Sequence, residues 1–276
     1  MNRLLIANFT RIKKNKLFWA GIIFMFLYGI MLIGVKFTDA RMYGYHVTID
    51  QLLFYYCLPI GFIIAAFSSL FLGTEYSDGT IRNKLIIGHS RLSVYFANLI
   101  TNIIVAILLC ISYLLSIVTV GFMLLGTFTF PIDKGLLMFL GTLLLIIAFC
   151  SIFTLISMVC TSKAATAVIS ILGVLALLIT AALIGARLDT PAFQDSFTYS
   201  DKTGVQFNEQ QPNPKFLTGT KRIVYESVYD ILPTGQSLQY TMLKAVHLWQ
   251  MPLYSMLIVF LTTAIGVRLF KKKDLK

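Results

Sequence analysis

The residue types that carry acid–base and metal chemistry are missing from the most apolar parts of this sequence. A carrier driven by protons or sodium, an intramembrane protease or a metalloenzyme would need such groups inside its apolar core. Ser and Thr do occur there, but without a neighbouring base they more often pack helices than act as nucleophiles. We therefore expect no catalytic residue and no metal site. Asp, Glu, Lys, Arg and His are absent from six stretches, at roughly 17–35, 52–72, 95–123, 135–160, 164–186 and 251–267.

Nucleotide and redox chemistry also lack their usual residues. The sequence has no GxxxxGK[ST] loop, so we expect this chain to hold no cofactor and not to bind a nucleotide in the usual P-loop manner. If the chain takes part in energised transport, the energy comes from another subunit. No CxxC pair is present, and we expect the cysteines to pack as small apolar residues without disulfides; they are Cys57, Cys110, Cys150 and Cys160.

The composition requires a membrane. Of the 276 residues, 57% are hydrophobic and 13% are charged, and the mean hydropathy is +0.80. A soluble domain carries roughly 25% charged residues, so this chain could not cover its surface with polar groups. Each of the six stretches approaches the roughly 20 residues that a helix needs to cross a bilayer, and lone strands cannot satisfy their backbone in lipid. We expect an all-α integral membrane protein, one transmembrane domain over 1–276 with six spans.

The charge pattern predicts the orientation. Six spans put both termini on one side, together with the loop near 73–94 and Lys163, and that side holds fourteen basic residues against three acids. The other side holds nine of each, so the net charge of +11 comes from one face. Basic flanks mark the cytoplasmic side, so we expect both termini in the cytoplasm and the chain in the cell membrane. Topology and contact with anionic lipid account for the charge, and we expect no nucleic-acid partner.

Two segments outside the spans have patterns of their own. Residues 1–16 carry Leu5, Phe9 and Ile12 at helical spacing among basic residues, which predicts an amphipathic elbow helix in the inner interface. The segment 187–250 is polar in its first half and helix-permissive in its second. There we expect an extracellular cap, before the last span, with one or two short helices.

The cytoplasmic loop between the second and third spans, 73–94, is the most informative stretch. Asp78 and Gly79 favour a turn, Thr80 can cap a short helix, and Gly88 can end it. This helix would present Ile81, Leu85 and Ile86 on one side, with Arg82, Asn83 and Lys84 elsewhere. Such a helix suits docking into a groove on a soluble partner, although a loop lying on lipid would have the same pattern.

The loop and its context resemble the permease subunits of type 2 ATP-binding-cassette transporters. The pattern G-x-E-[YW]-x-x-G-T-[IL]-[RK]-x-x-L-x-x-x-x-S-R matches Gly73 to Arg91, directly after the second span and before the third. The similarity extends to the basic N-terminal helix, the short inner loop at 160–166, the large outer segment before the sixth span and the basic tail.

The resemblance implies that residues 76–90 form a coupling helix seated on a separate ATPase. Glu75 would close the inner end of the second span and pair with Arg82, Lys84 or Arg91. Ser162 and Lys163 would touch the same ATPase or form a plain turn. The residues that the resemblance assigns to ATPase coupling are Glu75, Tyr76, Asp78, Gly79, Thr80, Ile81, Arg82, Lys84, Leu85 and Arg91.

The resemblance also implies an assembly. Two permeases, identical or homologous, would form the pathway of an exporter above two ATPase subunits, in contact with membrane lipid. The cargo would be amphipathic, such as a drug, an antimicrobial peptide or a lipid-like molecule, which connects the chain with antimicrobial resistance. An alternative is a membrane-embedded immunity or sensor protein that binds a peptide antibiotic without moving it and needs no coupling loop. An ion channel is disfavoured because no span offers a continuous polar stripe.

Overall fold

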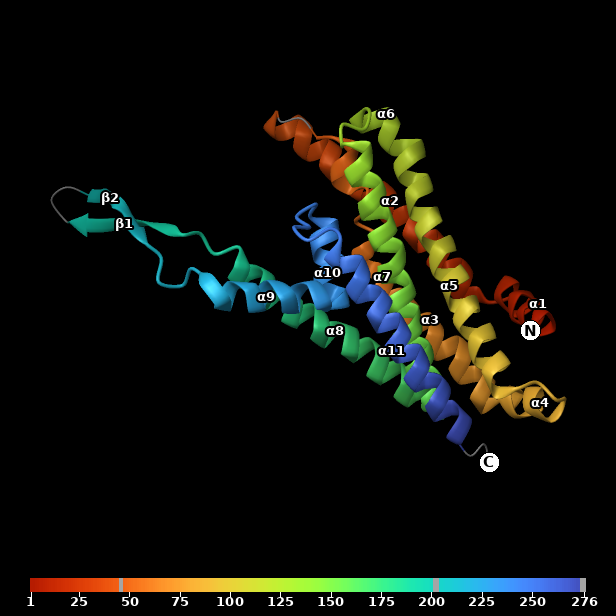
Figure 1. Cartoon of the computed structure of the whole chain (residues 1–276). Helices are drawn as coiled ribbons and strands as arrows, with labels where there is room; N and C mark the ends of the chain where they lie inside the picture. The colour runs from red at the N-terminus through yellow and green to blue at the C-terminus, as the bar shows by residue number, and fades with distance from the viewer. Residues whose placement is uncertain (45–46, 201–203, 274–276) are drawn as a thin grey trace.

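The structure is a computed structural model that describes residues 1–44, 47–200 and 204–273, with backbone alone for 195–200 and 204–209. Asp274 and Lys276, which were counted at the basic end, lie outside the described residues. The chain forms an elongated bundle of helices, and its first helix, α1 (Asn2–Lys13), and the end of its last helix lie at the end of the bundle where α4 (Thr80–Ile86) projects (Figure 1).

Six helices of the described chain are long and apolar enough to cross a membrane. The expected all-α membrane bundle is therefore confirmed. A short 3₁₀ turn, η1 (Ile49–Leu52), precedes the second span, and a π turn, η2 (Ile117–Gly121), with the short helix α6 (Phe122–Leu125) extends the third. The six main helices are α2 (Lys16–Tyr43), α3 (Cys57–Ser77), α5 (Arg91–Ser116), α7 (Ile132–Val159), α8 (Lys163–Leu188) and α11 (Gln250–Lys272).

Three of these spans form the centre and three lie around it. Within their most apolar windows, α3 is 61% buried, α7 56% and the third span 44%, whereas α2 is 22% buried and α8 and α11 are each 17% buried. Helix α2 packs on α5, α8 on α3, and α11 on α7. The outer three therefore keep broad apolar faces for lipid or for another membrane protein.

The end of the bundle opposite α4 holds the segment between the fifth and sixth spans (Figure 1). Helices α9 (Gly219–Ile231) and α10 (Pro233–Thr241) lie in its second half, where short helices were predicted. Its first half contains an antiparallel hairpin of β1 (Phe193–Ser200) and β2 (Gly204–Pro212), which the sequence analysis did not anticipate. The polar composition of that stretch had indicated only the absence of a span.

Helix α10 is fixed inside the bundle by buried polar contacts. It packs against α3, α7 and α8, and Gln236 on it is fully buried. The Gln236 amide donates to the carbonyl oxygen of Asp230 at 2.7 Å, and the Ser255 hydroxyl of α11 donates to the Gln236 side-chain oxygen at 2.7 Å. These bonds satisfy an amide that would otherwise destabilise an apolar core.

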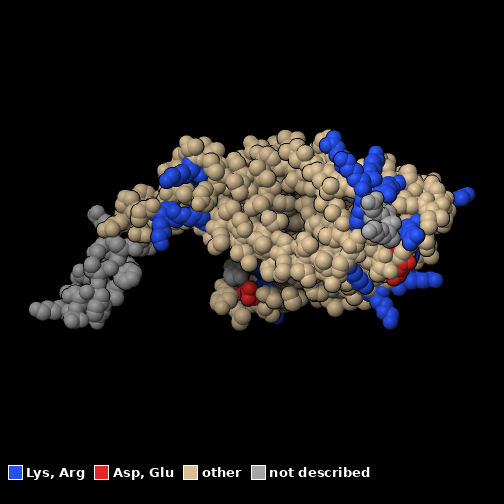
Figure 2. Space-filling model, turned by 90° about the horizontal axis from the view of Figure 1, so that it is seen from below, with Lys and Arg blue, Asp and Glu red and all other residues tan. Residues whose placement is uncertain are grey.

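Charge is distributed along the bundle as the spans require. Figure 2 shows Lys and Arg side chains gathered at one end of the visible face and a smaller group towards the hairpin, with a broad, mostly uncharged belt between them and acidic surface at the lower edge of that belt. This belt is consistent with the six apolar helices crossing the bilayer side by side.

The corner between α9 and α10 gives a stability prediction. A β-carbon at Gly235 would lie 2.1 Å from the Tyr229 carbonyl oxygen, whereas a β-carbon at Gly173, in α8, would meet no atom within 4 Å. Gly235→Ala should therefore force a backbone shift that costs about 1–3 kcal/mol, and its thermal midpoint in detergent should fall below that of Gly173→Ala. Equal midpoints for the two variants would contradict the tight corner.

Candidate functional site

The loop after α3 turns sharply into the short helix α4 (Thr80–Ile86). Gly79 lies in the N-cap position with φ +65°, a left-handed conformation that strains any residue with a β-carbon. Thr80 is the first helical residue and makes no capping bond, so the expectation that it caps the helix was wrong: the reversal between two consecutive helices needs the glycine there.

Gly88 ends α4 as expected, with φ +96°. Its N–H donates to the Leu85 carbonyl oxygen at 3.0 Å, and the N–H of His89 donates to that of Lys84 at 3.2 Å. This pair of bonds is the Schellman motif, which satisfies the last free carbonyls of a helix. The next helix follows almost at once, because Ser90 accepts a hydrogen bond from the Ser93 N–H at 3.1 Å and caps α5.

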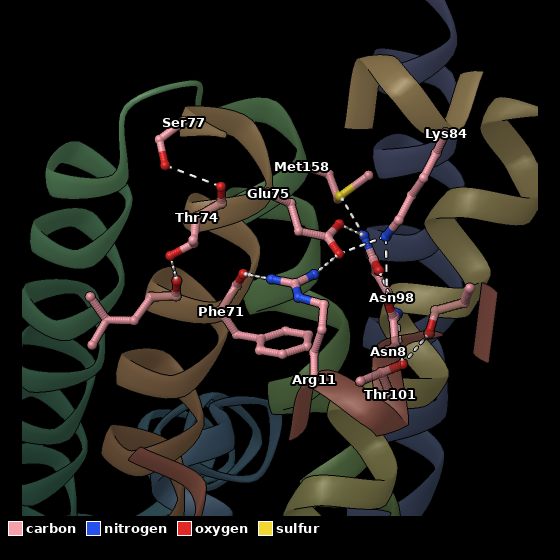
Figure 3. A network of polar contacts seen from close by, with 12 residues as sticks. Asn8, Arg11, Phe71, Thr74, Glu75, Ser77, Lys84, Asn98, Thr101 and Met158 are labelled. Carbon is pink, nitrogen blue, oxygen red and sulfur yellow. Dashed lines mark hydrogen bonds and ion pairs between the residues drawn. The ribbon is translucent and has the colours of Figure 1, made fainter. Parts of the chain in front are cut away.

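Glu75, in the last turn of α3, is fully buried and bound from three other elements (Figure 3). It forms ion pairs with Arg11, on α1 (Asn2–Lys13), and with Lys84 on α4, whose Nζ lies 2.6 Å away. The Asn98 amide of α5 donates to its second oxygen at 3.2 Å. A buried carboxylate needs such partners, so it holds α1, α4 and α5 against α3.

Side-chain amides extend this arrangement. The Asn8 amide donates to the Asn98 oxygen at 2.9 Å and to the Thr101 hydroxyl at 3.0 Å, and its own oxygen accepts a hydrogen bond from Lys84 at 3.3 Å. Asn8 and Asn98 are both fully buried. We call the set of Asn8, Arg11, Glu75, Lys84, Asn98 and Thr101 the Glu75 cluster.

Arg11 is held on a second side as well. Its guanidinium lies over the Phe71 ring, 4.5 Å from the centroid, and donates to the Phe71 carbonyl oxygen at 3.4 Å. The Arg11 side chain thereby packs against α3 while its charge pairs with Glu75. The helix predicted over 1–16 thus has Leu4, Asn8 and Ile12 as its buried face, with Leu5 and Phe9 only partly buried.

Arg91 and Tyr76 form hydrogen bonds with the last turns of two spans, α11 and α7, near the Glu75 cluster. The Arg91 guanidinium donates to the carbonyl oxygens of Phe270 at 2.9 Å and Lys271 at 3.1 Å, at the last turn of α11. The Tyr76 hydroxyl donates to the Met158 carbonyl oxygen at the end of α7. Both contacts satisfy helix-end carbonyls that have no partner within their own helix.

Lys273 completes this contact between α7 and α11. Its ammonium donates to the carbonyl oxygens of Met158 at 3.1 Å and Val159 at 2.9 Å, and lies 4.1 Å from the centre of the Tyr76 ring. Burial lowers the pKa of this lysine below its usual value. The neighbouring Cys160 acts in the opposite direction and raises the pKa of the lysine.

The surface that α4 exposes differs from the one expected. Ile81 is 1% exposed and packs into the core, and Leu85 is partly buried. Ile86 and Ile87 are 73% and 78% exposed, and Arg82 and Asn83 are exposed beside them. The rotation of the helix is set by Lys84, which must face Glu75, so the opposite side turns outward. We call Arg82, Asn83, Ile86 and Ile87 the α4 outer face.

The remaining predicted residues lie nearby but have separate roles. Asp78 is exposed and bonded to Ser77 at 3.2 Å. Ser162 caps α8 by accepting from the Ala165 N–H at 3.4 Å, and both Ser162 and Lys163 are exposed. A β-carbon at Gly73 would lie 3.1 Å from the Lys163 α-carbon, so α3 and α8 approach closely there.

The expected partners of Glu75 were only partly right. Lys84 pairs with it, but Arg82 points outward and Arg91 binds α11. Asn8, Arg11, Asn98 and Thr101 were not identified from the sequence. A polar Asn on the apolar face of residues 2–14, and an Asn within the third span, were signals that could have indicated a buried partner.

Comparison with known proteins gives one match. A family model described as ABC-2 family transporter protein matches residues 4–186, which is most of the chain and contains the whole Glu75 cluster. No curated protein and no solved structure matches the sequence.

The cluster predicts a specific effect of removing the buried charge. Glu75→Gln leaves Arg11 and Lys84 facing a neutral amide, which should cost about 2–3 kcal/mol, at the low side for a buried pair because Arg11 is 33% exposed. Amide hydrogen exchange in α1 and α4 should then rise at least tenfold. The matched control is Asp78→Asn, which removes an exposed carboxylate three residues later. Amide hydrogen exchange in α1 and α4 of this variant should match that of the wild type. Equal exchange in both variants would show that Glu75 does not hold these helices.

Proposed function

Because the chain belongs to the ABC-2 family of transporter proteins, we propose that it is the permease of an ATP-driven exporter whose ATPase is a separate subunit. Its six apolar helices supply the membrane part, and its sequence has no GxxxxGK[ST] loop, so the ATPase binds the ATP and Mg²⁺. The basic end of the bundle faces the cytoplasm of a cell membrane, with both termini on that side.

The observation that supports this proposal is the α4 outer face, which is exposed while the opposite side of the helix packs against the bundle. Two isoleucines more than 70% exposed, beside an arginine, form a small amphipathic surface at the cytoplasmic end. A helix presented in this way fits a groove on a soluble partner. Ser162 and Lys163, exposed where α8 begins beside α3, offer a second contact with the same ATPase.

The Glu75 cluster supports a route for movement from the ATPase into the membrane. Lys84 binds α4 to the last turn of α3, and Arg11 and Asn98 bind the same carboxylate from α1 and α5. A displacement of α4 therefore displaces the end of α3, the most buried span. Rigid-body motion of this kind converts nucleotide-driven closure of the ATPases into alternation between inward- and outward-open states.

A working exporter of this design contains two permeases, identical or homologous, and two ATPase subunits. The broad apolar faces of α2 and α8, each less than a quarter buried in their windows, leave surface for the second permease. Because Asp, Glu, Lys, Arg and His are absent from the core of the spans, the pathway favours amphipathic cargo such as a drug, an antimicrobial peptide or a lipid-like molecule over small ions.

Co-purification tests the docking step. Ile86→Asp/Ile87→Asp places charges on the α4 outer face without removing any buried contact, so the chain should fold and keep its thermal midpoint. The amount of P-loop ATPase recovered with the tagged chain from native membranes should fall at least tenfold. Gly79→Pro and Glu75→Arg should also release the ATPase, with loss of local order as well.

The matched control is Ile132→Asp, which alters an isoleucine 80% exposed at the start of α7, at the other end of the bundle. ATPase recovery should be unchanged in this variant. A wild-type chain that purifies alone and shows no ATP hydrolysis, yet binds a peptide antibiotic, would replace the exporter with an immunity or sensor protein.

A further inference from the structure

A long apolar groove lies between α5, α7 and α11, on the lipid-facing side of the bundle. Its volume is about 710 Å³, and its walls include Phe96, Ile147 and Val259. It opens outward past Leu92, Met256 and Phe260, which are 41%, 54% and 70% exposed. The groove is separate from the Glu75 cluster and from the α4 outer face.

The groove has the length of one bilayer leaflet. Its apolar part extends along α11 from Met256 to Val267, which is twelve residues and about 16 Å at the rise of an α-helix. Half of a hydrocarbon core is about 15 Å thick. The groove can therefore receive an acyl chain over the full depth of one leaflet.

Its inner end is positively charged. Arg268 and Lys271 line the groove at that end and are both exposed. Within the described residues, neither side chain has a salt bridge. Arg91 donates to the carbonyl oxygens of Phe270, Lys271 and Lys273, and in the described part of the chain it has no salt bridge with a carboxylate. Among the residues that the structure describes, no Asp or Glu lines the groove.

From this arrangement we infer that the groove binds an anionic glycerophospholipid, with an acyl chain along α11 and the phosphate at Arg268 and Lys271. The charge pattern disfavours a second copy of the chain as the occupant. Neighbouring copies share one orientation, so a span in this groove would bring its own basic end to the same depth and repel these cations. An anionic headgroup is complementary to them instead.

Native mass spectrometry of the purified full-length chain, titrated with phosphatidylglycerol or phosphatidylcholine, tests the site. A basic side chain near the membrane surface changes binding of an anionic lipid about fivefold. Arg268→Gln/Lys271→Gln should therefore reduce the preference for phosphatidylglycerol over phosphatidylcholine about 25-fold and leave phosphatidylcholine binding unchanged. Lys13→Gln/Lys14→Gln removes the same charge from exposed positions on α1 and should keep the preference within about twofold.

A third variant separates the groove from the charge. Ala264→Trp fills the groove wall without altering any cation and should weaken the first adduct of both lipids. Three results would overturn the inference: equal binding of the two lipids by the wild type, loss of preference in the α1 control as large as in the groove variant, or wild-type lipid binding by Ala264→Trp. The thermal midpoints of all variants, measured in the same detergent, identify any that are misfolded.

Discussion

A carboxylate taken fully out of water must find cations and hydrogen-bond donors, and Glu75 draws its partners from three helices besides its own. That requirement fixes how α1, α4 and α5 are arranged around the end of α3. Lys84 must face inward, so α4 rotates Ile86 and Ile87 outward. Arg11 must reach the same oxygen, so α1 packs against α3 and α5 instead of resting on lipid alone. The proposed docking surface is thus a consequence of a single buried charge.

The rest of the bundle follows from the need to keep charge out of the bilayer. The three central spans are the most buried of the six, while α2, α8 and α11 keep apolar faces toward their surroundings. Ionisable residues lie mainly at the two ends of the bundle. At the end that contains α4, Arg91 donates to a carbonyl oxygen at the end of α11, and Lys273 donates to one at the end of α7.

Much of this could be read from residue types alone. The six spans, the fold class and the turn at Gly79 and Gly88 depend on local composition and on positive φ angles, which sequence patterns report directly. The partners of Glu75 depend on how α1 lies across α3, a contact between residues 64 positions apart that no local pattern encodes. The same holds for Ile81, which helical spacing placed on an outer face and packing turned inward. The β1–β2 hairpin was missed because the polar composition of that stretch indicated only that no span lies there.

We propose that the ATPase binds the end of the bundle that contains the Glu75 cluster. The most direct measurement introduces a photoreactive amino acid at Ile87, or at Ile132 at the opposite end, and irradiates intact cells. We expect a covalent adduct between the Ile87 variant and a P-loop ATPase of the same cell, and no such adduct with the Ile132 variant. An ATPase that co-purifies with the chain but cross-links only from Ile132 would contradict this proposal.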